Sequence, residues 1–112
     1  SVLFGLGTGK DALALAALSA RLPEGDYEIA GDGGQSFNHI AAAWADGAYR
    51  FDRYKAEKTS PPRLKVPAGN EGERLSREAD AAAHLRDMVN TPAADMTPAG
   101  LQAEMAALAE AF

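Results

Sequence analysis

The chain has 112 residues, a net charge of −5 and no cysteine. An acidic balance argues against a nucleic-acid surface or an anionic membrane surface, because both need a positive footprint. The lack of cysteine excludes disulfides, thiolate metal sites and cysteine nucleophiles. Apolar residues make up 46%, but 25 of them are alanine, which predicts a helix-rich protein with a thinly packed core. No apolar run approaches the ~20 residues of a membrane span or has the pattern of a signal peptide, so we expect a cytoplasmic protein.

The first third of the chain predicts a strand, a helix and a second strand. Residues 2–7 (VLFGLG) form an apolar run that glycines end, and they predict a buried strand. Residues 11–22 are rich in alanine and leucine, and they predict a helix that Pro23 stops. Residues 27–30 predict a short strand, which a glycine-rich turn through residues 31–34 follows.

The next predicted element is an amphipathic helix that Ser36 caps. Its apolar residues recur at helical spacing and predict a buried face, which comprises Phe37, Ile40, Ala41, Trp44, Ala48 and Phe51. The i,i+4 spacing predicts two ion pairs on the solvated side of this helix, Asp46–Arg50 and Arg53–Glu57.

The last part of the chain predicts one strand and two helices. Residues 63–67 alternate apolar and polar and predict a strand. Asn70 with Glu73 resembles a capping box at the start of a helix. The apolar face of that helix is expected to comprise Leu75, Ala79, Ala82, Leu85 and Val89.

A break at residues 90–96 separates this helix from the last one, because Pro92 pushes Thr91 out of helical geometry. Thr97 is then predicted to cap the last helix, with Pro98 at its first position. The apolar face of the last helix is expected to comprise Leu101, Met105, Leu108 and Phe112.

This alternation of strands and helices predicts an α/β fold, with a small, mostly parallel or mixed sheet flanked by helices and followed by a connecting helix. We expect an N-terminal α/β domain over residues 1–70, a connecting helix over 71–90 and the start of a further domain over 91–112. Both ends look cut, because the chain opens on an apolar run and stops in a helical pattern. The sequence leaves open whether further strands of the sheet precede residue 1.

The segment from Gly5 to Gly9 is the first candidate for ligand binding, because it follows a predicted strand and precedes a predicted helix, as a phosphate loop does. The spacing before Lys10 is one residue too short for a Walker loop, and Asp11 stands where a hydroxyl should hold magnesium. A carboxylate there would repel phosphate. A glycine-rich turn is the simpler interpretation, and a small anionic or nucleotide-like ligand at Gly5 to Gly9 is kept as the alternative function.

The remaining polar residues predict no catalytic, cofactor or metal site. The two histidines, His39 and His84, lie on different predicted helices without ligand-like spacing. Asp80 and Asp87 flank His84 and are expected to form a surface group with it. Among the neighbouring aromatic residues Trp44, Tyr49, Phe51 and Tyr54, the first and third are expected in the core. A second polar group is a candidate surface for a partner, and it comprises Tyr49, Arg50, Arg53 and Lys55. A solvated helix face is the simpler interpretation of this group.

Three passages nevertheless resemble one family, the leucyl aminopeptidases or dinuclear-metal cytosol aminopeptidases. Residues 43–55 (AWADGAYRFDRYK) resemble a helix of that family's N-terminal domain, and residues 4–11 (FGLGTGKD) resemble a strand-turn-helix there. Residues 85–101 (LRDMVNTPAADMTPAGL) resemble the passage R-D-L-x-N-x-P-x-N-x-x-x-P, although Ala94 stands where these proteins often have asparagine. The residues that match are Arg86, Asp87, Asn90, Thr91, Pro92, Ala93, Met96, Thr97 and Pro98.

The resemblance implies a parent enzyme that removes N-terminal amino acids from peptides, with two divalent cations (Zn or Mn) activating a bridging water. It implies a homo-oligomer, by family habit a hexamer, with peptide as substrate and no nucleic acid or membrane as partner. The family's metal ligands lie in motifs further downstream, and Lys10 lacks the context of the ligand lysine. We therefore expect no catalytic, cofactor-binding or metal residue in this chain, which would be an inactive scaffold and assembly domain.

Overall fold

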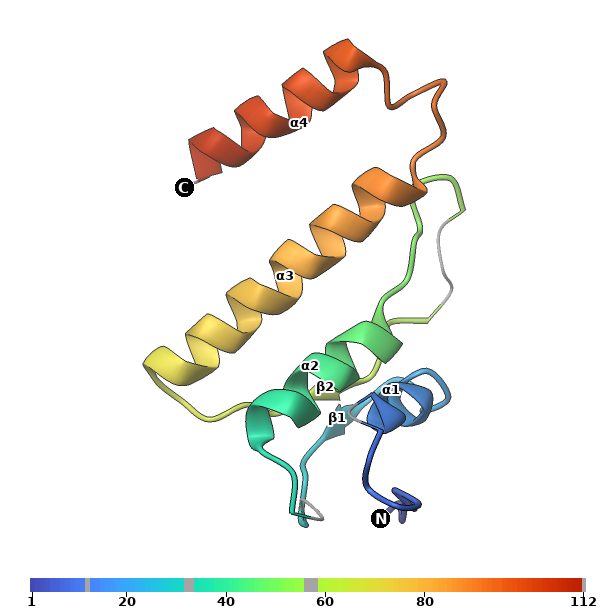
Figure 1. Cartoon of the computed structure of the whole chain (residues 1–112), viewed down its shortest axis with the longest axis vertical. Helices are drawn as coiled ribbons and strands as arrows, with labels where there is room; N and C mark the ends of the chain where they lie inside the picture. Colours follow the sequence, from blue (N-terminus) through green and yellow to red (C-terminus); the bar gives the residue numbers. More distant parts are fainter. Residues whose placement is uncertain (12, 32–33, 56–58, 112) are drawn as a thin grey trace.

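The computed structural model describes residues 1–11, 13–31, 34–55 and 59–111. The structure is helix-rich with a small two-stranded parallel sheet, which confirms the predicted α/β class. Helix α2 lies between α1 and α3, and α4 turns back beyond the C-terminal end of α3 (Figure 1). The elements in chain order are α1 Ala14–Ser19, β1 Asp26–Tyr27, α2 Phe37–Ala48, β2 Arg63–Leu64, α3 Asn70–Asn90 and α4 Pro98–Ala111.

The sheet consists of β1 and β2, whose parallel pairing places Asp26 opposite Arg63. The backbone N–H groups of Arg63 and Lys65 donate to the carbonyls of Gly25 and Tyr27, both at 2.8 Å. Helix α2 lies in the crossover between the two strands, as parallel pairing requires. Each strand keeps only two residues, fewer than the sequence predicts, because backbone pairing is confined to this short register.

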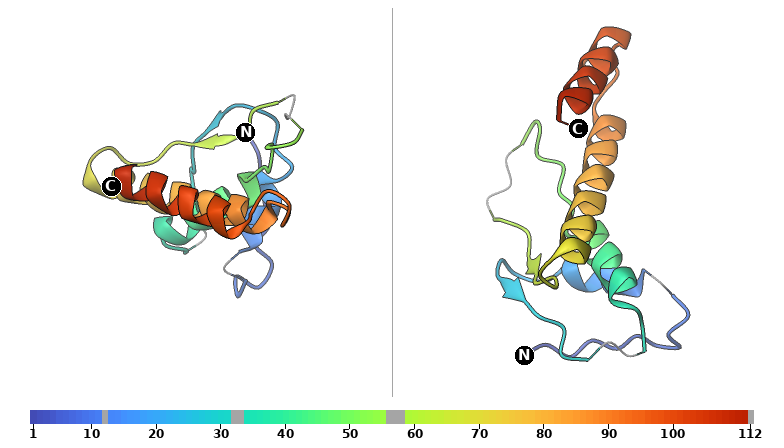
Figure 2. Two further views of the ribbon diagram at one scale, coloured as in Figure 1. Left: turned by 90° about the horizontal axis from the view of Figure 1, so that it is seen from above. Right: turned by 90° about the vertical axis from the view of Figure 1, so that its left-hand side faces the viewer.

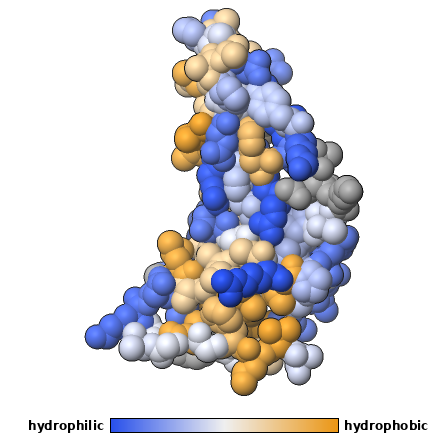
Figure 3. Space-filling view, turned by 90° about the vertical axis from the view of Figure 1, so that its right-hand side faces the viewer, coloured by the Kyte–Doolittle hydropathy of each residue, from blue (hydrophilic) through white to orange (hydrophobic). Residues whose placement is uncertain are grey.

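The prediction of a buried strand over residues 2–7 is wrong. This segment is not a strand, and Val2 is 58% exposed and Leu3 101% exposed. Phe4 and Leu6 are partly buried against the core, so the segment packs through only some of its apolar side chains. A strand needs a paired backbone, and none pairs with this segment in the part of the chain that the structure describes. Figure 3 shows apolar surface at this lower end of the molecule.

Helices α1 and α2 form the body of the fold. The predicted helix over residues 11–22 shortens to α1, and the predicted extension of α2 to Phe51 is wrong, because Tyr49 takes an extended backbone with ψ 136°. The predicted cap is confirmed, since the hydroxyl of Ser36 accepts from the N–H of His39 at 3.4 Å.

The core lies between α1 and α2. Leu15, Ile40 and Ala43 are buried there. Trp44 is 4% exposed, and its indole N–H donates to the carbonyl of Pro62 at 3.1 Å, which ties α2 to the segment before β2. The ring of Tyr27 on β1 lies 5.6 Å from the Trp44 ring, between centroids. One aromatic side chain therefore joins α2 to β1 and to the segment before β2.

Helices α3 and α4 form an arm that projects from this body (Figure 2). The predicted capping box at Asn70 and Glu73 is wrong, because α3 begins after Gly69, with no side-chain cap and with φ 98° at that glycine. On the predicted apolar face, Leu75 is buried, but Leu85 is 60% and Val89 76% exposed.

Helix α4 begins as predicted, since the N–H of Gly100 donates to the Thr97 hydroxyl at 3.1 Å. Its predicted apolar face is exposed at Leu101, Met105 and Leu108, and Phe112 lies outside the described residues. None of the helices described is both long and apolar enough to cross a membrane.

Candidate functional site

The segment from Gly5 to Gly9 does not form a phosphate loop. Gly7 and Gly9 take φ values of 58° and 69°, and the N–H of Gly9 donates to the Leu6 carbonyl at 3.0 Å, which makes an ordinary tight turn. Helix α1 starts only at Ala14, and the carboxylate of Asp11 accepts from the Leu13 N–H at 2.9 Å. A carboxylate thus occupies the place where an anionic ligand would meet the helix start.

The histidines lie on different helices, His39 on α2 and His84 on α3, and His84 lies close to an acidic side chain. Its Nε2 lies 3.8 Å from a carboxylate oxygen of Glu104 on α4. No group of three histidine or acidic side chains able to hold a metal ion occurs within residues 1–11, 13–31, 34–55 and 59–111.

The most developed polar arrangement is a seam between α2 and the C-terminal half of α3. Arg86 donates to the carboxylate of Asp46 at 2.6 Å and to the carbonyl of the same residue at 3.0 Å. Its guanidinium also lies 4.1 Å from the centroid of the Tyr49 ring. The predicted Asp46–Arg50 ion pair is therefore wrong, because a more distant arginine takes the carboxylate and Arg50 donates instead to the carbonyls of Gly47, Tyr49 and Ala20.

Tyr49 extends the seam towards the end of α3. Its hydroxyl donates to the carboxylate of Asp87 at 2.6 Å and accepts from the side-chain amide of Asn90 at 3.1 Å. Partial burial, followed by the hydrogen bond to Asp87, raises the pKa of Tyr49 above its ordinary value. The neutral phenol is thus the form that holds the seam together.

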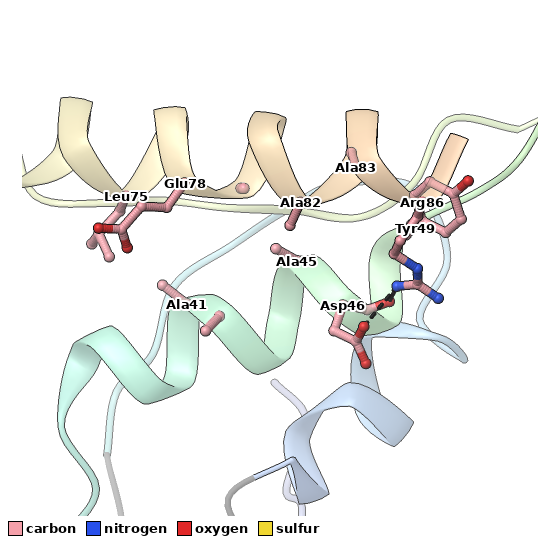
Figure 4. A pocket seen from close by; sticks show the side chains of 11 residues that line it. Ala41, Ala45, Asp46, Tyr49, Leu75, Glu78, Ala82, Ala83 and Arg86 are labelled. Atoms are coloured by element: carbon pink, nitrogen blue, oxygen red, sulfur yellow. Dashed lines mark hydrogen bonds and ion pairs between the residues drawn. The ribbon is translucent and has the colours of Figure 1, made fainter. Parts of the chain in front are cut away.

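Between the two helices the seam is lined by small side chains (Figure 4). Ala41 and Ala45 of α2 face Ala82 of α3 across a cavity of about 130 Å³. Leu75 closes one end of this cavity, and the Asp46–Arg86 ion pair lies at the other. Alanine side chains let the helices approach closely while filling little volume, so the polar contacts fix the register of α3 on α2.

A second set of contacts involves the residues after α2. Arg53 donates to the Thr91 hydroxyl at 3.2 Å, and the Tyr54 hydroxyl donates to the carboxylate of Asp95. The predicted Arg53–Glu57 pair has its second member outside the described residues. Two arginines and a tyrosine of the predicted solvated group, Tyr49, Arg50 and Arg53, thus bind other parts of the chain.

Residue patterns alone missed this seam, because its partners are about 40 positions apart. The resemblance did single out Arg86, Asp87, Asn90 and Thr91, and all four make side-chain contacts with the α2 end or the segment after it. Helical spacing could not identify Asp46 and Tyr49 as their partners.

Comparison with known proteins agrees with this architecture. The sequence pattern of the M17 aminopeptidase N-terminal domain matches residues 1–67. The crystal structure of cytosol aminopeptidase from Coxiella burnetii is similar, with a TM-score of 0.77 and 25% identity over 92% of this chain. The chain spans 24% of the length of that protein. No curated protein matches the chain. This chain therefore belongs to the M17 aminopeptidase family, whose N-terminal domain it carries.

Proposed function

We propose that this chain is a non-catalytic scaffold and assembly domain of an aminopeptidase, a hydrolase that removes N-terminal amino acids from peptides. Family membership supports the parent activity. The observation that carries the scaffold role is the α2–α3 seam, in which Arg86, Asp87 and Asn90 hold α3 against Asp46 and Tyr49. A helix held in this way would fix the placement of whatever follows it.

The proposed organisation follows the same logic. Residues 1–70 would form the N-terminal domain, 71–90 the connecting helix, and 91–112 the start of the catalytic domain. The two divalent cations, Zn or Mn, would be held by other parts of the parent enzyme, because the described residues bring no suitable group of ligands together. The parent would act in the cytoplasm as a homo-oligomer, with peptide as its substrate.

A hydrolysis assay tests the non-catalytic role. The purified chain, incubated with Mn or Zn and leucine p-nitroanilide, should release no product. Cytosol aminopeptidase under the same conditions is the positive control. Turnover by the chain would show that it carries its own active site and would overturn this part of the proposal.

The scaffold role is tested by the rigidity of the seam. Because the chain lacks cysteine, Glu28→Cys and Asp80→Cys give two unique spin-label positions, one next to β1 and one on α3. We expect a narrow distance distribution between the labels, and a broad one once Arg86→Gln removes the ion pair with Asp46. Arg77→Gln is the matched control, because the ion pair that Arg77 makes in the described part of the chain is with Glu73 on its own helix, at 3.9 Å. An unchanged distribution in Arg86→Gln would refute the idea that the seam fixes α3.

A further inference from the structure

Helix α4 has few contacts of its own that could fix its direction. Leu101 is 41%, Met105 63% and Leu108 46% exposed. Between α3 and α4, the His84 imidazole comes within 3.8 Å of the Glu104 carboxylate. A single contact of this kind, between side chains that are 38% and 32% exposed, contributes little stability. Something other than helix packing therefore sets the direction in which α4 leaves α3.

The link between α3 and α4, residues 91–97, is itself tightly folded. The N–H groups of Asp95 and Met96 both donate to the carbonyl of Pro92 at 2.9 Å. A Cβ atom added at Gly100 would lie 2.7 Å from the Asp95 carbonyl oxygen, so the start of α4 presses against the link. Any movement of the link would consequently carry α4 with it.

The segment after α2, residues 50–55, contacts this link at two points. We call this segment the strap. Arg53 donates to the hydroxyl of Thr91, which is 6% exposed and donates in turn to the carbonyl of Asp87 at 2.6 Å. One turn further along the link, Tyr54 donates to the carboxylate of Asp95. The ring of Tyr54 rests edge-on against Phe51, with 5.9 Å between the centroids. The strap is therefore hydrogen-bonded to both the start and the middle of the link.

We propose that the strap is a conformational clamp, in which Arg53 and Tyr54 hold the link and thereby set the direction of α4. Release of the strap would leave the α1–α2 body and its seam with α3 intact but would let α4 swing about residues 91–97. In the proposed parent enzyme the clamp would make the orientation of the catalytic domain depend on the N-terminal domain. That last consequence rests on the proposed function, whereas the clamp itself does not.

Hydrogen exchange and spin-label distances in the whole chain test the clamp without any activity measurement. The variants are Tyr54→Phe, which removes one hydroxyl, and Tyr54→Phe combined with Arg53→Gln. Tyr27→Phe is the matched control, because its hydroxyl donates to the Pro23 carbonyl at 3.0 Å, far along the chain from the link. Labels on Ser76→Cys and Gln102→Cys report the distance between α3 and α4.

In the double variant we expect amide exchange in residues 93–97 to accelerate by about tenfold, and the α3–α4 distance distribution to broaden, with exchange in α2 unchanged. The control should behave as the parent chain does. Exchange and distances that stay unchanged in the double variant would overturn the clamp. Acceleration spread equally over α2 would overturn it as well, because the strap would then support the core rather than the link. Failure of the proposed function would be evident separately, as peptide-amide turnover by the chain.

Discussion

Gly47 lies where α1 and α2 approach each other most closely, and it offers the sharpest test of how the body is packed. A Cβ atom at this position would lie 2.0 Å from the carbonyl oxygen of Ala16 and 2.2 Å from the hydroxyl of Ser19. The carbonyl belongs to the backbone of α1, so it cannot move away by changing rotamer. In Gly47→Ala, α1 would have to retreat from 2.0 Å to the 3.4 Å of an ordinary contact, about 1.4 Å.

The expected cost follows from two opposing effects. Inserting a methyl group into a packed contact destabilises a protein by typically 1–3 kcal/mol. Replacing glycine by alanine inside a helix stabilises the helix by roughly 0.5–1 kcal/mol. We therefore expect a net loss of about 1–2 kcal/mol, which for a domain of this size lowers the Tm by roughly 10 °C.

The single tryptophan, Trp44, makes the measurement direct, because it is buried beside this contact. Urea and thermal unfolding would be followed by its fluorescence. Gly5→Ala is the matched control, since nothing lies within 4 Å of a Cβ there, and its stability should change by less than about 0.5 kcal/mol. If Gly47→Ala were as stable as the control, the close approach of α1 and α2 would be refuted.

Two further substitutions test the contacts between elements. Ser19 is fully buried, and its hydroxyl donates to the Trp44 carbonyl at 2.9 Å, so Ser19→Ala should lower the free energy of unfolding in urea by about 1 kcal/mol, with an unchanged slope; an unchanged midpoint would contradict this contact. The raised pKa of Tyr49 means that folding favours its neutral phenol. The contribution of Tyr49 to the free energy of unfolding is therefore fully present below about pH 10, and it is lost as the pH rises through the higher pKa of the folded state. The hydrogen bond to Asp95 also raises the pKa of Tyr54, so a phenolate titration should show two late-titrating tyrosines. Tyr49→Phe should remove one of these two, and loss of an early-titrating tyrosine instead would count against the seam.

Local sequence patterns were sufficient where one short segment decides the outcome. Ser36 and Thr97 cap their helices as predicted, because a cap needs only a hydroxyl and an amide a few residues away. The alternation of elements also predicted the α/β class correctly, and the sheet, expected to be mostly parallel or mixed, is parallel. The resemblance predicted the family, which the match over residues 1–67 confirms.

The same patterns failed where partners come from distant parts of the chain. Helical spacing paired Asp46 with Arg50, yet Arg86 takes that carboxylate, because α3 brings a guanidinium to it across the seam. Spacing also placed Leu85 and Val89 on a buried face, and both are exposed, since α3 packs on α2 mainly through other positions. The spacing of apolar residues predicts which face of a helix is buried. It does not predict how much of the helix length the neighbouring helix covers.

Composition, caps and apolar spacing by themselves determined that the chain forms short strands among helices, because these features depend on backbone propensity and nearest neighbours. The tertiary structure alone decided that residues 2–7 are not a strand and that α3 is held by Tyr49 and Asp46. Strand pairing and side-chain contacts over 40 positions depend on which surfaces meet in space, and the geometry of the whole chain fixes that meeting.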